Sequence, residues 1–315
     1  MQRPREAAPT LPSRWPGDRG AHLWAKDREV VLPDGTRVRY TVRGPAGAPW
    51  VVLAPGFLCP DTFWRDLAPE LTHDHRVIML NHRGTGASTE AGGGSLPPGA
   101  EAYRIPRLAE DVLAVMDAEA AAPATLVGHS MGVQVALEAA RARPELVRSL
   151  VLVAGTHTSP FRTMYGSSVA SYLFPVVSMA GAAAPRQLSR RVVRSIELPI
   201  VRPVAIAMRA AAEHTPWAGL TTYRAHLSRV DPRTAIWTAR GMHHFDPEPW
   251  LHRVAPPTSV VVGTRDGWCP IAVGERQAAA IPDARLEVVP DASHTLPLEH
   301  PEVVLRHVHH VQRRA

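Results

Sequence analysis

A serine framed by glycines is the residue in this chain best placed to do chemistry. The segment Gly128–Gly132 reads Gly-His-Ser-Met-Gly, with Ser130 at its centre. An apolar run, Ala124–Val127, precedes it, and a helix-forming run, Gln134–Ala140, follows it. A serine in a sharp turn between a strand and a helix exposes its hydroxyl, and the helix N-terminus beneath it favours developing negative charge. The pattern therefore predicts a nucleophilic serine at position 130.

A serine hydroxyl is a weak nucleophile, so this prediction requires a general base. The chain has 16 histidines, and only position can discriminate among them. His294 follows the last expected strand, Leu286–Val289, in a loop that opens on the same sheet edge as Ser130. His129 is next to the serine in sequence, but it is expected to point away from it across the turn. We therefore predict that His294 is the base.

The base in turn needs a carboxylate that fixes its tautomer and stabilises the imidazolium. Two strand ends could supply one. The run that ends at His157 offers no acid, whereas the run Ser259–Gly263 is followed by Asp266. Asp291 is close to His294 in sequence but fits a turn better. The prediction is therefore a set of Ser130, Asp266 and His294.

An attacked carbonyl group also needs two backbone N–H donors for the oxyanion that forms on it. Met131, which opens the helix after the serine, is expected to supply one of them. Phe57 is expected to supply the other, because it lies in the Pro-Gly loop that follows the apolar run Trp50–Ala54.

The elements that must position these residues follow one another in an alternating order. Apolar runs typical of strands occur at residues 29–32, 37–42, 50–54, 77–80, 124–127, 149–155, 259–263 and 286–289. An Asp-Gly pair between the first two runs predicts a hairpin. Helical patterns separate most of the later runs, which implies a mostly parallel α/β sheet with helices on both faces.

The alternation stops after Thr156 and resumes near residue 250. Residues 157–249 are helical and apolar in pattern, with Met, Ala, Leu and Arg interleaved. We interpret them as a helical lid inserted over the carboxyl edge of the sheet, where open α/β sheets bind ligands. The core domain then comprises residues 23–156 and 250–315. Residues 1–22, rich in Pro, Arg and Gly, are expected to form a disordered extension.

Composition limits the class of protein. A chain of 315 residues with 45% hydrophobic residues can bury a large core. We find no apolar run near 18 residues and no apolar signal-peptide segment at the N-terminus, so a cytoplasmic protein is expected. The net charge is +6. An acidic partner or a membrane surface would explain it, but we favour arginine-rich composition spread over the surface, because no dense basic block lies outside the chain ends.

Two stretches of the insertion are strongly apolar, Tyr172–Val177 and Pro199–Met208. They could line an acyl pocket, contact a membrane or form the ordinary core of a lid. We favour the last of these. The two cysteines, Cys59 and Cys269, are expected to be free thiols, because their strands would lie too far apart for a disulfide.

With these motifs in order, residues 28–312 resemble the α/β-hydrolase family, in its serine branch of esterases, lipases, lactonases and haloperoxidase-like enzymes. The resemblance rests on Leu126–Val133, Gly263–Asp266 and Ser293–Pro301. It implies an eight-stranded, mostly parallel sheet with a lid insertion. A serine nucleophile argues against the branches that use aspartate, the haloalkane dehalogenases and epoxide hydrolases.

The chain departs from the pattern of that family at two positions. Pro55 stands where the family often has histidine, which affects the expected second oxyanion donor. Asn81 stands where the family often has aspartate, before a segment that supports the oxyanion loop in the family. We expect the change at position 81 to alter this support and not the chemistry.

The predicted function is hydrolysis of a carboxylic ester, thioester or lactone with an apolar acyl group, through an acyl-enzyme on Ser130. A cofactor-free perhydrolase of the haloperoxidase type and a C–C bond hydrolase would use the same three residues. A binding protein without turnover is a third alternative. We expect a small-molecule substrate and no nucleic acid or cofactor. We also expect no metal ion, because His73, His75 and His82 lack a spaced set of carboxylates.

Overall fold

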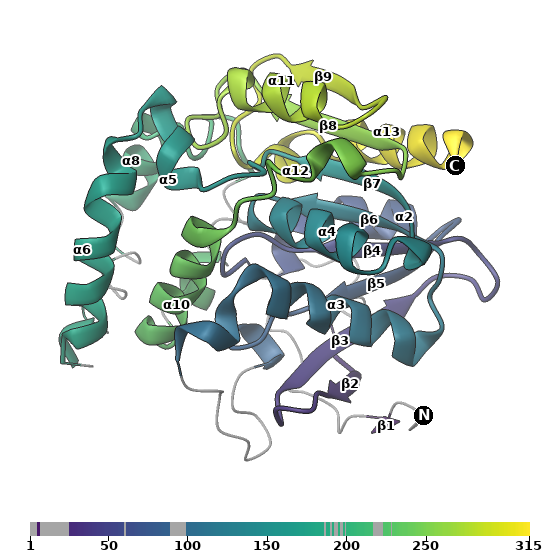
Figure 1. Cartoon of the computed structure of the whole chain (residues 1–315), viewed down its shortest axis with the longest axis horizontal. Helices are drawn as coiled ribbons and strands as arrows, with labels where there is room; N and C mark the ends of the chain where they lie inside the picture. The colour runs from purple at the N-terminus through teal and green to yellow at the C-terminus, as the bar shows by residue number, and fades with distance from the viewer. Residues whose placement is uncertain are drawn as a thin grey trace.

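A nine-stranded sheet forms the centre of the computed structural model (Figure 1). The structure describes residues 5–6, 25–59, 61–88, 99–185, 187–189, 191, 195, 198, 200–216, 223–227 and 229–315. In space the strands follow the order β1-β2-β3-β5-β4-β6-β7-β8-β9. Their bounds are β1 Arg5–Glu6, β2 Arg28–Val31, β3 Arg37–Arg43, β4 Trp50–Ala54, β5 Arg76–Leu80, β6 Ala124–His129, β7 Val147–Val153, β8 Thr258–Gly263 and β9 Arg285–Val289.

The strands from β4 to β9 are parallel, and β2 and β3 form an antiparallel hairpin at one side. At the hairpin turn, the Leu32 N–H donates to the Thr36 carbonyl at 2.9 Å, as the Asp-Gly pair predicted. Strands β2 to β9 confirm the expected eight-stranded sheet. The two-residue strand β1 is additional and lies within the segment 1–22, whose other residues are outside the described part of the chain.

Helices cover both faces of the sheet, and successive strand residues alternate between them. Leu126 and Leu150 face one helical layer, and Val127 and Val151 face the other. This burial on both faces explains why these strands are apolar without alternation. The first layer comprises α3 (Ile105–Glu119), α4 (Met131–Ala142) and α11 (Ile271–Ala280), and the second comprises α2 (Leu67–Leu71) and α13 (Pro301–Arg314).

The helical segment that follows β4 is interrupted. The structure has a 3₁₀ helix, η1 (Asp61–Trp64), followed by the short helix α2. Pro69 lacks the N–H group that would bond to the carbonyl of Arg65, so the α-helical bonding cannot extend back through this position. The last helix, α13, packs on the sheet through one apolar stripe, in which Val304, Val308 and Val311 are fully buried.

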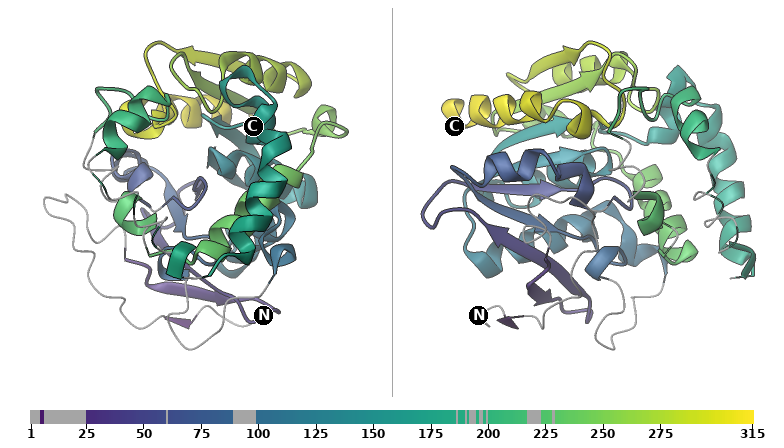
Figure 2. Two further views of the ribbon diagram at one scale, coloured as in Figure 1. Left: turned by 90° about the vertical axis from the view of Figure 1, so that its left-hand side faces the viewer. Right: turned by 180° about the vertical axis from the view of Figure 1, so that it is seen from behind.

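Between β7 and β8 the described residues form helices joined by loops, and these helices lie near the carboxyl ends of the strands (Figures 1 and 2). Helix α10 packs against η3 (Ala100–Tyr103), where the rings of Tyr103 and Trp237 lie 5.5 Å apart. Helix α6 stands outside α10 at the edge of the molecule. The elements here are α5 (Pro160–Thr163), η5 (Met164–Gly166), α6 (Val169–Ala183), α8 (Val201–Ala207), α10 (Pro232–His244) and η7 (Leu251–Arg253).

Three short elements complete the described chain: η2 (Gly86–Ser88), η4 (Pro144–Leu146) and α12 (Leu296–Glu299). None of the helices in the described residues is long and apolar enough to cross a membrane.

Candidate active site

Ser130 occupies the sharp turn between β6 and α4, in a backbone conformation that side chains rarely adopt. Its φ is 54° and its ψ is −116°. Glycines make this turn sterically feasible. A Cβ atom on Gly128 would lie 2.3 Å from the Gly132 carbonyl oxygen, and one on Gly155 would lie 2.4 Å from the Ser130 carbonyl oxygen. The two glycines of the motif, and one from the end of β7, therefore allow the strained serine that the motif predicted.

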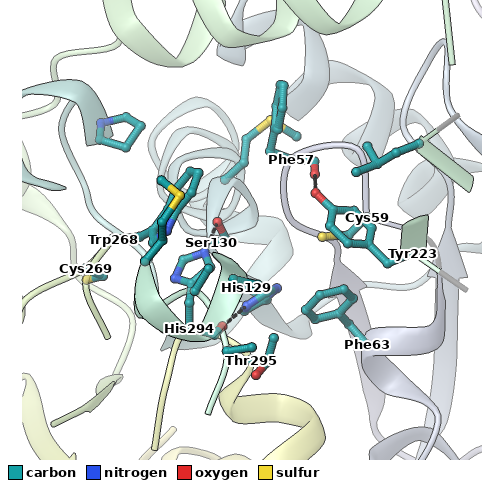
Figure 3. Close-up of a pocket in the computed structure, with 18 of the residues that line it drawn as sticks. Phe57, Cys59, Phe63, His129, Ser130, Tyr223, Trp268, Cys269, His294 and Thr295 are labelled. Carbon is teal, nitrogen blue, oxygen red and sulfur yellow. Dashed lines mark hydrogen bonds between the residues drawn. The ribbon is translucent and has the colours of Figure 1, made fainter. Parts of the chain in front are cut away.

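The structure brings the predicted base and acid to this serine, and Figure 3 shows the base, His294, beside it. His294 Nε2 lies 2.9 Å from Ser130 Oγ, and His294 Nδ1 lies 2.9 Å from Asp266 Oδ2. The Asp266 side chain is fully buried, and that of His294 is 17% exposed. The imidazole can therefore accept the serine proton at one nitrogen while its other nitrogen stays hydrogen-bonded to a carboxylate.

The Asp266 carboxylate is fixed in one orientation by its own loop. Its Oδ1 accepts the backbone N–H groups of Trp268 at 2.7 Å and Cys269 at 2.8 Å. The other carboxylate oxygen, Oδ2, is therefore left to bond with His294. The Trp268 ring also stacks on the His294 imidazole, with centroids 5.8 Å apart and an interplanar angle of 28°. Backbone bonds and stacking thus hold both groups in the geometry that proton transfer requires.

His129 holds the backbone of the predicted base, a role that the sequence did not indicate. Its Nε2 donates to the carbonyl oxygen of His294 at 2.9 Å (Figure 3). Burial, with the neighbouring His294, lowers the His129 pKa to about 3, so the ring is neutral at physiological pH. The ring also stacks on Phe63 with centroids 5.0 Å apart. The histidine beside the serine is therefore a fixed support and not a competing base.

A partly buried carboxylate, Glu299, secures the other side of the His294 loop. Glu299 Oε1 accepts hydrogen bonds from the hydroxyls of Ser293, Thr295 and Thr215, and Oε2 accepts the Ser293 N–H at 2.7 Å. Thr215 belongs to the helical segment between β7 and β8, so this network joins that segment to the loop of the base. Burial alone would raise the Glu299 pKa, but the hydrogen bonds outweigh it and lower the pKa below its usual range.

We expect the substitution Glu299→Gln to lower the free energy of unfolding at pH 7 by about 2 kcal/mol, since it disrupts a buried network around a charged acceptor. The folded-state pKa is depressed, so the charge-dependent stabilisation is complete above the unfolded-state pKa of about 4.3. It is lost as the pH falls through the lower folded-state value.

Urea unfolding at several pH values measures this effect. The difference between the wild type and Glu299→Gln should shrink below about pH 4. Glu302→Gln is the matched control, because that side chain is 65% exposed. An equal loss of stability in both variants would contradict the assignment.

Phe57 and Met131, the predicted oxyanion donors, both line the same cavity as Ser130. Met131 opens α4, whose first N–H groups have no acceptor within the helix. The loop of Phe57 is held from two sides. The His82 ring donates to the Pro55 carbonyl at 3.2 Å, and the Tyr223 hydroxyl donates to the Phe57 carbonyl at 3.2 Å. The family often has a histidine at the position of Pro55. In this chain, His82 from the end of β5 supports the loop instead.

Asn81 contacts the segment after this loop, as expected for a supporting residue. Its Oδ1 accepts the Ala87 N–H at 3.0 Å, and its Nδ2 lies 3.4 Å from Asp61 Oδ1. Asp61 also pairs with Lys26 at 2.7 Å. The amide therefore ties the end of β5 to η1, and Asn81 is not among the residues that line the cavity at Ser130.

A cavity of about 630 Å³ lies above Ser130, between the carboxyl edge of the sheet and the helical segment. Its walls are mostly apolar and include Phe63, Phe161, Val204, Met208, Leu227 and Met242. Helix α8, from the second apolar stretch of the insertion, contributes to the wall, whereas most of Tyr172–Val177 is exposed. Our interpretation of these stretches as ordinary lid core was therefore wrong for the described residues, because one lines the cavity and the other faces solvent.

Cys59 and Cys269 are free and buried, as expected. Burial raises the pKa of both thiols, so neither is a ready nucleophile. In the described residues, one group could hold a metal ion: Asp74, His75 and His309, whose ligand atoms lie within 4.8 Å of one another. His75 immediately precedes β5, at the sheet edge opposite Ser130, so this group takes no part in the cavity.

Comparison with known proteins agrees with this fold. The model of the alpha/beta hydrolase family matches residues 51–307. A protein of Variovorax paradoxus, provisionally named carbamate hydrolase RutD, is 29% identical over 261 residues, which are 82% of this chain and 89% of that protein.

Two solved structures have the same fold. A hydrolase from Pseudomonas aeruginosa PA01 has a TM-score of 0.71 and 25% identity over 90% of this chain and 97% of its own. The enol-lactonase from Burkholderia xenovorans LB400 has a TM-score of 0.68 and 22% identity over 90% and 98% of the two chains.

The fold, the strained serine and its histidine partner define a hydrolase of the α/β class. The chain belongs to the alpha/beta hydrolase family.

Proposed function

We propose that this protein is a serine hydrolase that cleaves a carboxylic ester with an apolar acyl group. The observation that carries the proposal is the line of hydrogen bonds from Ser130 through His294 to Asp266 beneath an apolar cavity. Thioesters and lactones present the same carbonyl carbon and belong to the same proposed substrate class.

In the proposed reaction, His294 removes the proton from Ser130 as its Oγ attacks the ester carbonyl carbon. The N–H groups of Phe57 and Met131 bind the oxyanion of the tetrahedral intermediate. As the intermediate collapses, His294 returns the proton to the leaving alcohol and leaves an acyl group on Ser130. Water, deprotonated by His294, then attacks this ester, and Ser130 regains its proton as the carboxylic acid leaves.

The helical segment 157–249 has the role of a lid in this proposal. Its side chains at Phe161, Val204 and Met208 form the wall opposite the serine. An acyl chain between this wall and the sheet edge would be removed from water, which supplies the binding energy for an apolar substrate. We infer that the lid selects the acyl group.

A series of p-nitrophenyl esters with increasing acyl length tests the substrate class. We expect kcat/KM to rise about fourfold per methylene, since each buried CH₂ is worth about 0.8 kcal/mol, and then to level off when the cavity is full. The substitution Ala205→Phe places a ring in the cavity wall and should shift the optimum to shorter chains.

Ala207→Phe is the matched control for this series, because Ala207 is on the same helix but exposed. A profile that does not vary with chain length would contradict an acyl pocket.

Carbamates of the same phenol, a vinylogous diketone, and acetate with hydrogen peroxide belong in the panel. Faster turnover of one of these would replace ester hydrolysis with carbamate hydrolysis, C–C hydrolysis or peracid formation.

Labelling with a fluorophosphonate separates an enzyme from a binding protein of the same fold. We expect the wild type to be labelled at Ser130. Absence of labelling in the folded protein would contradict an activated serine.

A further inference from the structure

The outer side of α6 presents an apolar surface. This helix has no charged side chain along its 15 residues. Tyr172 is 77% exposed and Val176 is 69% exposed, and Leu173, Val177 and Met179 are each at least 60% exposed. We call these five residues the apolar face of α6. An exposed apolar area of this kind is costly in water and marks an interaction surface.

The opposite side of α6 already has its packing partners. The Phe174 ring stacks on Phe161 with centroids 3.9 Å apart, and Ser178 is buried. A Cβ atom on Gly181 would lie 3.0 Å from the Ile236 side chain of α10. Positions 174, 178 and 181 follow a helical spacing, so the apolar face lies on the side of the helix opposite to these contacts. Figure 2 shows α6 at the edge of the molecule.

Helix α8 lies at the same end of the molecule as α6 but apart from it, as the left view of Figure 2 shows. Val204 and Met208 line the cavity and are each 43% exposed. The side of the molecule that carries the apolar face therefore also carries a wall of the cavity.

The net charge of the protein lies in the same part of the chain. Residues 160–209 contain seven arginines and one glutamate, whereas the remaining residues contain 28 basic and 28 acidic side chains. In the sequence, the excess of +6 therefore belongs to the stretch that contains α6 and α8. The described arginines of this stretch are all exposed: Arg162, Arg191, Arg202 and Arg209. The Arg209 guanidinium donates to the backbone carbonyls of Thr264 and Arg265, so the surface relies on the other three.

We propose that this side of the molecule binds an anionic lipid bilayer. The apolar face of α6 enters the boundary between headgroups and acyl chains. Exposed arginines of the same stretch lie against the phosphates, among them Arg162 on α5, the helix that packs against α6. Membrane-surface helices combine these two features, an apolar face and flanking basic side chains. A second copy of the chain fits less well, because a symmetric contact through this surface would bring two groups of arginines together. The proposal goes beyond ester hydrolysis and does not depend on it.

Co-sedimentation with vesicles tests the proposal. We expect binding to vesicles of equal parts phosphatidylglycerol and phosphatidylcholine to be at least about tenfold stronger than to phosphatidylcholine alone, and to weaken as salt is raised. The double variant Tyr172→Ser with Val176→Ser should lower the partition coefficient at least about tenfold. Arg162→Gln should lower it about fivefold, as expected for one charge near the surface.

Val31→Ser is the matched control. Val31 is a valine that is 54% exposed, but it lies on strand β2 of the sheet and not in the helical segment between β7 and β8. It should bind vesicles like the wild type. Equal binding to both kinds of vesicle, no binding to either, or an unchanged double variant would overturn the proposal. Sedimentation velocity that shows a dimer in the wild type and a monomer in the double variant would also overturn it, in favour of a second copy.

Two further measurements separate this proposal from the proposed function. Ser130→Ala should bind anionic vesicles like the wild type, because the serine is not part of the surface. The double variant on α6 should hydrolyse a soluble short-chain ester at the wild-type rate. Vesicle binding without esterase activity would therefore contradict only the proposed hydrolysis. Esterase activity without vesicle binding would contradict only the proposed lipid-binding surface.

Discussion

Replacement of Ser130 by alanine is expected to lower kcat for the preferred ester about 10⁶-fold, since nucleophile and base act as one unit. The variant keeps the cavity, so KM should change little. The Ser130 hydroxyl is the group that His294 contacts at 2.9 Å, and without it no acyl-enzyme can form. Steady-state kinetics with a chromogenic ester, and mass spectrometry after a rapid quench, measure the two losses.

Ser159 provides the matched control for this prediction. It is a buried serine whose Oγ lies 3.0 Å from His243 Nδ1, so it forms a second serine–histidine contact in the helical segment. Ser159→Ala should keep kcat within about tenfold of the wild type, because this serine does not line the cavity and its histidine contacts no carboxylate in the described bonds. If Ser159→Ala lowered kcat more than Ser130→Ala, the assignment of Ser130 as the nucleophile would be wrong.

Asp266→Asn is expected to lower kcat about 10⁴-fold while the protein stays folded. Oδ1 of this side chain accepts two backbone N–H groups, from Trp268 and Cys269, so the oxygen of the new amide must stay in that position. Its NH₂ group then faces His294 Nδ1 and donates to it. His294 must therefore carry its proton on Nε2, the tautomer that cannot accept the proton of Ser130.

Asp291→Asn tests whether any carboxylate near the base would serve. Asp291 is three residues from His294 in sequence, but its side chain is 68% exposed and pairs with Arg265 at 2.8 Å. Asparagine also tolerates the positive φ of 59° at this position. We expect kcat within about twofold of the wild type, since exposed pairs contribute little. A loss comparable to that of Asp266→Asn would contradict the assignment of the acid.

The sequence by itself determined the turn at Ser130 and the elements around it. A glycine two positions before and after the serine is a local requirement, because a Cβ atom at Gly132 would lie 2.1 Å from a backbone oxygen of the neighbouring strand β4. The apolar runs predicted the strands, because burial on both faces leaves no room for polar side chains. Asp266 and His294 could be chosen because parallel strands end at one edge.

Only the tertiary structure decided what supports and surrounds these residues. The bond from His129 to the His294 carbonyl joins positions 165 residues apart, and the bond from Thr215 to Glu299 joins positions 84 apart. No local pattern encodes such pairs, because they depend on how the helical segment packs on the sheet. The same packing decided that α8 lines the cavity while α6 turns its apolar face outward, although both read as apolar helices in the sequence.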